Sequence, residues 1–232
     1  MNSSFVGYQV YINAANKLKF LLQGTTNLSG TGATALSINN WYHIVVTYDG
    51  SGASSGINFY INGDSETFTG SGSNSGGVSN SENFEIGART GASDAVDGKL
   101  SNISVFNVVL SEDDVLNLYN NGVPQNLNNF RITPTAWWPM DQSYTYFNGS
   151  VLVARDVISA NDGTGVNIIQ ENIIGNAPGS EASGTGTNLT IADLKGDMKD
   201  SKRNAYSINM ADYADGVTNP ANSGRSTEVP SV

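Results

Sequence analysis

The first 130 residues contain short runs in which apolar and polar positions alternate, which is the two-residue period of a half-buried β-strand. Residues 7–12 and 17–22 each place three apolar side chains on one face. Further strands are predicted at 41–48, 57–61, 65–69, 83–87 and 99–109. Because no long helical pattern separates these runs, the spacing predicts an antiparallel sandwich and not a parallel sheet with crossover helices.

Turn and capping residues divide these runs. Asn62-Gly63 is a strong two-residue hairpin signal. The stretch 70–81 is almost wholly Gly, Ser and Asn and predicts a loop. Ser111 predicts the start of a short helix of about three turns, because its hydroxyl can cap the helix and Asp114 completes a capping box. Gly122 is expected to end this helix.

The strand pattern weakens after residue 130. An aromatic group at 136–139 precedes two candidate strands at 150–158 and 166–174. From residue 176 onward Gly, Ser, Thr, Asn and Asp dominate, which predicts an extended arm that orders only against a partner. The predicted organisation is a sandwich domain at 1–129, a strand-containing extension at 130–175 that packs on the sandwich or on a neighbour, and a low-complexity arm at 176–232.

Composition narrows the classes of function. The net charge is −10, from 11 Lys and Arg against 21 Asp and Glu, so the chain lacks the basic stripe that nucleic-acid binding needs. There is no cysteine, which excludes disulfides and thiolate metal sites. No apolar run approaches the roughly 20 residues that cross a membrane, and the N-terminal residues do not form a signal peptide. Neither nucleic-acid binding nor membrane insertion is predicted.

Five sequence blocks, in this order and spacing, resemble the laminin G-like and pentraxin-like family. They are Trp41–Gly50, Ile57–Gly63, Phe84–Gly87, Asp97–Phe106 and Leu110–Val115. The signature positions within them are Trp41, His43, Asp49, Tyr60, Gly63, Gly87, Gly98 and Ser111. The resemblance implies an all-β, concanavalin A-like (laminin G-like) antiparallel β-sandwich with one short helix, here followed by an irregular C-terminal extension.

The chain departs from this family at its start. The resemblance implies roughly 40 to 60 residues before the strand at 7–12, including an aromatic-rich strand, whereas only six residues precede it here. A sandwich without those strands exposes a sheet edge and an open core face. Three explanations remain open: a neighbouring subunit supplies the strands, the residues from 130 onward fold back to fill their place, or the true start lies upstream.

The sequence shows no convincing arrangement of catalytic residues. His43 is the only histidine, so a Ser-His-Asp triad would need it, and its position inside the strongest strand favours a packed structural role. A glycosidase needs two carboxylates placed about the scissile bond, and the closest approximation, Glu82–Glu85, lacks the middle Asp and the later Glu of related glucanases. We therefore predict that the chain is not an enzyme, with no catalytic residues and no certain cofactor.

Calcium is the cofactor that the resemblance makes worth testing, since related domains hold Ca²⁺ with loop oxygens. The candidate ligands are Asp49, Asp94 and Asp97, with Asn62 and Asp64 as further loop oxygens. Solvated turn residues are the favoured interpretation of all five. A second candidate surface is aromatic and could stack on sugars, although packing in a core or an interface is favoured. It consists of Trp137, Trp138, Tyr144, Tyr146 and Phe147.

The second half is similar to segments of structural proteins of tailed phages, especially marine ones. The segments that carry this similarity are Trp138–Asp141, Asp156–Thr164 and Thr187–Leu194. We therefore hypothesise a non-catalytic virion structural protein, a capsid decoration, fibre or appendage component, that is oligomeric on the virion surface with copies of itself or other virion proteins as partners. The alternative is a carbohydrate-binding lectin domain of a bacterial surface protein, extracellular or at the cell surface, with calcium-dependent binding of glycans to be tested.

Overall fold

The computed structural model describes residues 6–89, 94–174 and 177–178, which belong to one compact unit, Met1–Gly179. The arm predicted at 176–232 lies, apart from residues 177 and 178, outside the described residues. The described elements are mostly strands in antiparallel sheets with a single α-helix, so the predicted all-β sandwich class is confirmed.

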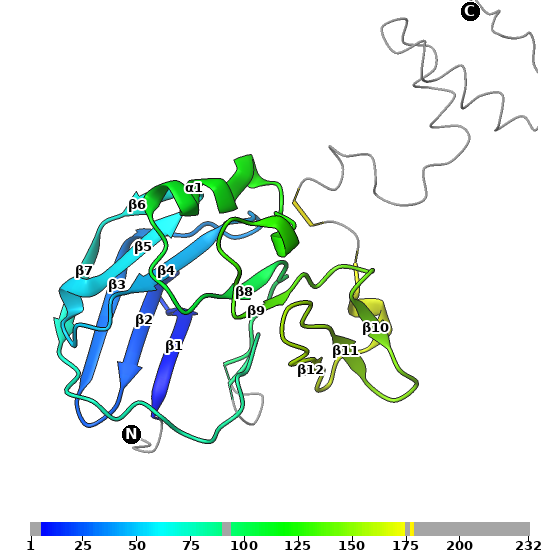
Figure 1. Cartoon of the computed structure of the whole chain (residues 1–232), viewed down its shortest axis with the longest axis horizontal. Coiled ribbons are helices and arrows are strands. Elements are labelled where there is room, and N and C mark those ends of the chain that lie inside the picture. The colour runs from blue at the N-terminus through cyan, green and yellow to red at the C-terminus, as the bar shows by residue number, and fades with distance from the viewer. Residues whose placement is uncertain (1–5, 90–93, 175–176, 179–232) are drawn as a thin grey trace, which may run out of the picture. The chain divides into compact units, whose positions relative to one another are not determined.

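Two antiparallel sheets form the sandwich (Figure 1). The first has the order β1-β2-β3-β7 and the second the order β4-β5-β6. Their bounds are β1 Gly7–Ile12, β2 Lys17–Gln23, β3 Asn27–Ala35, β7 Phe68–Gly72, β4 Ile44–Tyr48, β5 Ile57–Ile61 and β6 Asp64–Glu66. The strands predicted at 7–12 and 57–61 coincide with β1 and β5. β3 was not predicted, because its sequence NLSGTGATA offers no run of large apolar residues.

The inner faces of these sheets enclose the main core. Alternate residues of β2 and β3 meet alternate residues of β5 there, as their two-residue period requires. The buried members of this core are Leu18, Phe20, Leu22, Leu28, Ile57 and Phe59. Gly30 of β3 is a space-making residue, since a Cβ atom there would lie 3.0 Å from the Phe59 ring. The small residues of β3 therefore make room for the aromatic rings opposite them.

The helix α1 (Glu112–Tyr119) begins as predicted. Ser111 accepts from the Asp114 N–H, and the Asp114 side chain accepts from the Ser111 N–H, so the capping box is confirmed. The helix ends earlier than predicted, because Asn120 adopts the left-handed conformation (φ 46°) that terminates it before Gly122. The short 3₁₀ segments are η1 Ser54–Gly56, η2 Asn120–Gly122, η3 Leu127–Asn129 and η4 Gln170–Asn172. None of the described helices is long and apolar enough to span a bilayer.

The C-terminal half of the described chain joins the sandwich through a two-stranded sheet. β8 (Ile103–Val105) pairs with β9 (Ala136–Trp138), and a further sheet of β10 (Thr145–Phe147), β11 (Leu152–Ala154) and β12 (Gly163–Thr164) follows. Trp137 packs in a cluster with Tyr60 of β5 and with Val115 and Leu118 of α1. Residues beyond 130 thus fold back onto the outer side of the β4-β5-β6 sheet. Within the described residues β1 pairs only with β2, so these residues do not take the place of the strands that the resemblance implies before β1.

Several strand predictions were wrong or too long. The strand predicted at 41–48 begins only at Ile44, the one at 65–69 divides between β6 and β7, and the one at 150–158 shrinks to β11. Residues 83–87 form no strand; Phe84 is half exposed and uses its ring to contact Tyr8 and Trp138. Residues 166–174 contain η4 in place of a strand, and the strand at 99–109 shrinks to β8. Conversely, the predicted loop at 70–81 starts late, because β7 continues to Gly72. Each error follows from a short apolar run whose pairing partner is not evident locally.

Candidate functional site

The signature residues of the β5–β6 hairpin form a structural joint. Asn62 and Gly63 both have positive φ (55° and 89°), as a two-residue hairpin turn requires. The Asn62 side chain accepts from the His43 N–H at 2.9 Å, and the Asn62 N–H donates to the His43 carbonyl at 2.8 Å. A Cβ at Gly63 would lie 3.0 Å from the Tyr119 ring, so the helix α1 packs directly on this turn. These residues connect β4, β5 and α1.

The His43 imidazole belongs to this joint. Its ring lies 5.8 Å from the Tyr119 ring, and its Nδ1 is buried without a hydrogen-bond partner among the described residues. Burial lowers the pKa of His43 from its ordinary value, because the charged form loses hydration. A Ser-His-Asp triad needs an acid hydrogen-bonded to the imidazole, and this geometry supplies none to Nδ1. The arrangement fits the packed role expected from the sequence.

The lowered pKa of His43 predicts a pH-dependent stability. Below the unfolded-state pKa of about 6.5 the unfolded chain binds a proton that the folded chain does not, so stability falls as pH drops from 7 towards 5. We expect the urea midpoint of unfolding to decrease over this range, and the slope to flatten in His43→Phe. Equal slopes in both proteins would show that His43 does not cause the dependence.

The buried carboxylate of Asp114 is engaged in capping. Its Oδ2 accepts from the Ser111 hydroxyl at 2.6 Å and from the Ser111 N–H at 3.0 Å, and its Oδ1 pairs with Arg131 at 2.5 Å. The Ser111 hydroxyl, with help from Arg131, holds the pKa of Asp114 below its ordinary value although burial opposes this. The nearby signature residue Tyr60 is 5% exposed, and burial together with the charge of Glu112 raises its pKa. These groups stabilise the helix and present no free acid.

A second buried carboxylate, Asp156, organises the C-terminal half. It is 2% exposed and accepts hydrogen bonds from the backbone N–H groups of Trp137 (2.9 Å) and Ile158 (3.0 Å) and from the Ser159 hydroxyl. Ser159 N–H and Asn161 N–H add two longer bonds. Burial alone would raise the pKa of Asp156, but the hydrogen bonds outweigh it, and the pKa lies below its ordinary value. Asp156 therefore fastens the 156–161 turn to β9.

The calcium candidates are dispersed. Asp49 accepts from the Ser51 N–H at 2.9 Å, and the hydrogen bonds of Ser51 hold the pKa of Asp49 below its ordinary value. Asp94 pairs with Arg89 at 2.6 Å, both side chains are exposed, and Asp97 is exposed as well. Within residues 6–89 and 94–174, no three or more His, Cys, Asp or Glu side chains gather as a metal site would require. Calcium binding stays a prediction without a formed site to carry it.

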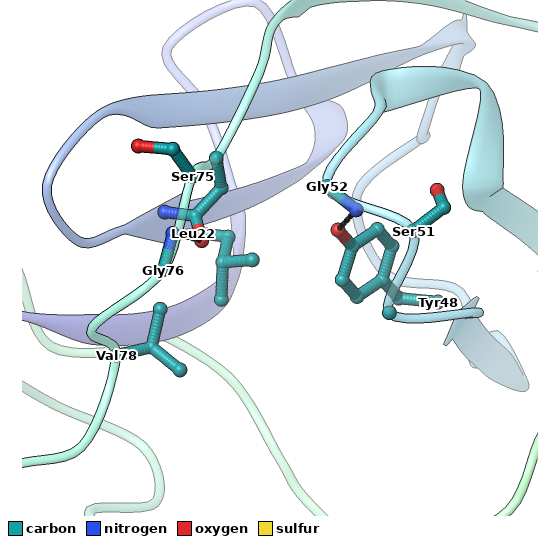
Figure 2. A pocket seen from close by; sticks show the side chains of 9 residues that line it. Leu22, Tyr48, Ser51, Gly52, Ser75, Gly76 and Val78 are labelled. Atoms are coloured by element: carbon teal, nitrogen blue, oxygen red, sulfur yellow. Dashed lines mark hydrogen bonds between the residues drawn. The ribbon is translucent and has the colours of Figure 1, made fainter.

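A pocket of about 390 Å³ opens at the end of the sandwich where β2 and β4 finish (Figure 2). Figure 2 shows the Tyr48 ring on one side and Leu22 and Val78 on the other. The rest of the lining is small and polar. It comprises Gly50, Ser51, Gly52, Asn74, Ser75 and Gly76. The lining offers one aromatic and two aliphatic side chains beside loop amides, and is more polar than that of most small-molecule sites.

Hydrogen bonds between loops hold the pocket open. The Gly52 N–H donates to the Tyr48 hydroxyl at 2.6 Å, so that hydroxyl keeps its own proton available to donate. The Asn74 N–H donates to the Gly52 carbonyl at 2.8 Å, and its side-chain amide donates to the Thr26 carbonyl at 2.6 Å. The loops after β2, β4 and β7 are thereby tied into one rim. The site is preformed by the backbone and uncharged along its lining.

The sequence did not identify this pocket. Tyr48 belongs to the block that carries the resemblance, but its pattern predicts only a strand, and the Gly- and Ser-rich stretch 70–81 predicts only a loop. The sequence does contain one relevant signal: Tyr48-Asp49-Gly50 and the Gly-rich segment 70–81 can both form tight turns at one end of a sandwich. That signal still required knowledge that β2 and β4 end together.

The aromatic candidates and the remaining signature residues lie in the core, at the surface or in irregular segments. Trp137 and Trp138 are 3% and 6% exposed core residues, as the favoured interpretation expected, whereas Tyr146 is 45% exposed. Trp41 opens the strand predicted at 41–48 but is 38% exposed, because β4 begins only at Ile44. Gly87 has a positive φ of 88° in an irregular stretch and not in a strand, and Gly98 likewise lies outside any strand.

Comparison with known proteins gives one match. A laminin G-type family model described as "Concanavalin A-like lectin/glucanases superfamily" matches residues 1–116. The match covers both sheets of the sandwich and ends within α1, so β9 to β12 and the Asp156 turn lie beyond it. No curated protein and no solved structure matches the chain significantly.

Proposed function

Because the chain belongs to the concanavalin A-like lectin/glucanase superfamily, with a laminin G-like domain, we propose that it is a non-catalytic structural protein displayed on the virion surface of a tailed phage. It would serve as a capsid decoration, fibre or appendage component and assemble with its own copies or with other virion proteins. The observation that carries the non-catalytic part of this proposal is that Asp114 and Asp156, the two carboxylates buried within the described residues, serve as structural hydrogen-bond acceptors.

The non-catalytic part of the proposal is supported by the roles of three buried or partly buried ionisable groups. Asp114 caps α1, Asp156 fastens a turn, and His43 packs on Tyr119. General acid–base catalysis needs a titratable group within reach of a substrate, and none of these three has that freedom. The virion part rests on the similarity of the second half to phage structural segments, one of which is the turn that Asp156 organises.

The virion proposal is tested on purified particles of a phage that encodes this chain. Antibodies raised against the full-length protein should label intact particles at regular positions in electron micrographs, and mass spectrometry should detect the chain in the banded particles. A chain that is present in infected cells but absent from the banded particles would contradict the proposal. Unlabelled intact particles that become labelled only after disruption would contradict the surface position.

The second candidate function, favoured by the pocket, is carbohydrate binding. A sugar ring could lie against Tyr48 while its hydroxyls meet the loop amides and the Tyr48 hydroxyl. Asp49, a candidate calcium ligand, lies between the lining residues Tyr48 and Gly50. A glycan array run with and without Ca²⁺ therefore separates calcium-dependent from calcium-independent binding.

A matched pair of variants tests the pocket itself. Ser75→Trp fills the pocket, whereas Ser79→Trp adds the same side chain at an exposed position of the same segment outside the lining. We expect at least about a tenfold loss of glycan affinity in Ser75→Trp, which corresponds to about 1.4 kcal/mol, and little change in Ser79→Trp. Equal binding by both variants would place any glycan site elsewhere, and no array signal would remove the candidate function.

A further inference from the structure

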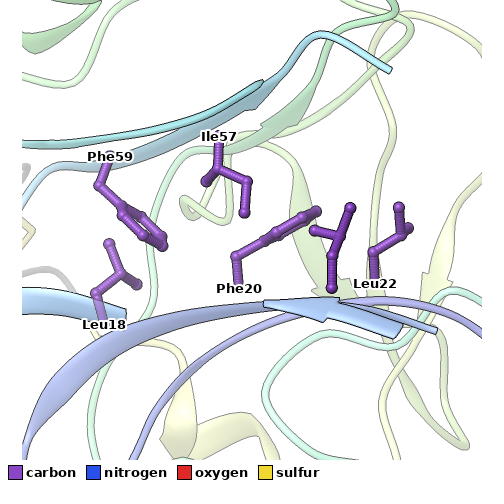
Figure 3. Packing of buried hydrophobic residues seen from close by; sticks show 6 residues of the cluster. Leu18, Phe20, Leu22, Ile57 and Phe59 are labelled. Atoms are coloured by element: carbon purple, nitrogen blue, oxygen red, sulfur yellow. The ribbon is translucent and has the colours of Figure 1, made fainter. Parts of the chain in front are cut away.

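Strand β1 has a half-exposed inner face, which among the described residues only the Phe84 ring contacts, at Tyr8. The antiparallel register places Tyr8, Val10 and Ile12 beside Leu22, Phe20 and Leu18, so both sets of side chains face the sandwich interior. Figure 3 shows the β2 set pointing towards Ile57 and Phe59 of the opposite sheet. In contrast, Tyr8, Val10 and Ile12 are 51%, 49% and 45% exposed. The sandwich core therefore continues onto β1, where the opposite sheet no longer covers it.

The outer edge of β1 also carries free backbone groups. The Asn13 N–H donates to the Lys17 carbonyl, which fixes the odd-numbered residues of β1 as those that hydrogen-bond to β2. Because the bonding direction alternates along an antiparallel strand, the N–H and C=O groups of Tyr8, Val10 and Ile12 point away from β2. Within residues 6–89 and 94–174 no strand other than β2 pairs with β1. The Asn80 side chain reaches the Val6 carbonyl, so the open edge begins at Tyr8.

Within the described residues this edge has few of the features that keep edge strands apart, since only Asn80, at Val6, and Phe84, at Tyr8, contact it. Proteins block edges with charges, prolines, bulges or covering segments. Residues 7–12 contain no charged residue and no proline, and the β1–β2 register is regular over all six residues. The chain as a whole carries a net charge of −10, so most of its surface repels a second copy at neutral pH. The uncharged β1 edge is a place where two copies can approach without that repulsion.

We propose that two copies of this chain associate through antiparallel pairing of their β1 strands. In the register with its two-fold axis at Val10, Tyr8 lies opposite the partner's Ile12 and Val10 lies opposite the partner's Val10. This register pairs all the outward backbone groups of the three residues, and each of the three residue pairs exchanges two hydrogen bonds. The proposed function names copies of the chain as partners but no surface, so the β1 surface goes beyond it and does not depend on it.

The side chains are self-complementary in the same register. Residues directly opposite each other must lie on the same face, and the pairs that contain Tyr8, Val10 and Ile12 all lie on the inner face. The Tyr8 pair with the partner's Ile12 is an aromatic–β-branched pair, a favourable cross-strand combination. The exposed inner-face strips of the two copies become one continuous apolar strip. A partner that placed a charged side chain opposite this strand would lose that packing.

The test measures the mass of the full-length protein in solution by sedimentation equilibrium at neutral pH. Wild type is expected to dimerise, and Val10→Lys is expected to weaken dimerisation at least about tenfold, because it places two like charges directly opposite each other at the axis. Val166→Lys is the matched control, since Val166 is a 73% exposed valine of the C-terminal half. A monomeric wild type, or a Val10→Lys protein that dimerises like the control, would overturn the proposal.

A second set of variants tests the register. Tyr8→Lys or Ile12→Glu alone should weaken the dimer, whereas the double variant places each Lys opposite the partner's Glu and should recover most of the affinity. Failure of the double variant to recover would overturn the register with its axis at Val10. Far-ultraviolet circular dichroism and the urea midpoint of each variant report whether the fold is retained, so that loss of dimer is measured on folded protein.

Discussion

Replacing Phe59 by alanine is expected to lower the free energy of unfolding by about 3–5 kcal/mol, the range for removing a fully buried aromatic side chain. Phe59 is 1% exposed and lies between the two sheets. Its ring meets Phe68 edge-on, with centroids 5.4 Å apart, and occupies the space that a side chain at Gly30 would need. The cavity left by alanine cannot close easily, because the backbone of β3 already lies against the ring.

Urea titration followed by tryptophan fluorescence measures this loss. Phe84→Ala is the matched control, since Phe84 is 51% exposed while still contacting Tyr8 and Trp138. We expect the control to lose about 1 kcal/mol, the ordinary effect of a substitution that removes partial burial. Comparable losses in the two variants would show that Phe59 is not the centre of the sandwich core.

Replacing Asp156 by alanine is expected to lower the free energy of unfolding by about 3 kcal/mol, because several buried donors lose their acceptor at once. The N–H of Trp137 lies inside the cluster that joins the C-terminal half to α1, so water cannot easily replace the carboxylate there. The N–H of Ile158 and the hydroxyl of Ser159 lose the same partner. The effect should spread to β9, because Trp137 is its central residue.

The control for this substitution is Asp141→Ala. Asp141 accepts from the Ser143 and Tyr144 N–H groups in a similar local turn but is exposed, so we expect a loss below about 1 kcal/mol. Because the pKa of Asp156 is lowered in the folded state, its contribution is present above about pH 4 and is lost as pH falls through the folded-state pKa. Part of the acid-induced loss of stability should therefore disappear in Asp156→Ala. Equal unfolding midpoints for the two alanine variants would contradict the proposed role of Asp156.

The sequence predicts the elements whose signals are local. β1 and β5 follow from strict alternation, and the hairpin after β5 follows from Asn62-Gly63. The start of α1 follows from the Ser111 capping box. In each case a few neighbouring residues hold all the physical information, namely a two-residue period, a positive φ or a side chain that caps a free N–H. Local chemistry of this kind needs no knowledge of the remaining chain.

Elements that depend on distant partners could not be predicted in this way. β3 is a strand because its small residues accommodate Phe59 and Phe68, and only the opposite sheet makes that evident. Residues 83–87 have strand-like composition, yet Phe84 stacks on Trp138 and pairs with no strand in the described part of the chain. The role of Asp156 also depends on long-range contact, since its donor Trp137 lies 19 residues away.

The candidate site likewise combines residues that the sequence identifies locally with a pocket that depends on distant contacts. His43, Tyr60, Gly63 and Ser111 are signature residues found from the sequence, and the structure gives each of them a place in the joint between β4, β5 and α1. The pocket, in contrast, is made by three loops from different parts of the chain. Its lining of glycine, serine and asparagine has no distinctive spacing. Only the sheet topology brings Tyr48 and Asn74 to the same rim.

The C-terminal half of the described chain packs on the sandwich and is expected to unfold together with it as one cooperative unit. Amide hydrogen exchange of the full-length protein tests it most directly, because exchange reports the free energy of opening of each segment. If the claim is correct, the amides of β9 and β11 exchange with the same free energy as those of β2 and β5. Exchange of β9 and β11 at a much lower free energy, while β2 and β5 stay protected, would contradict it.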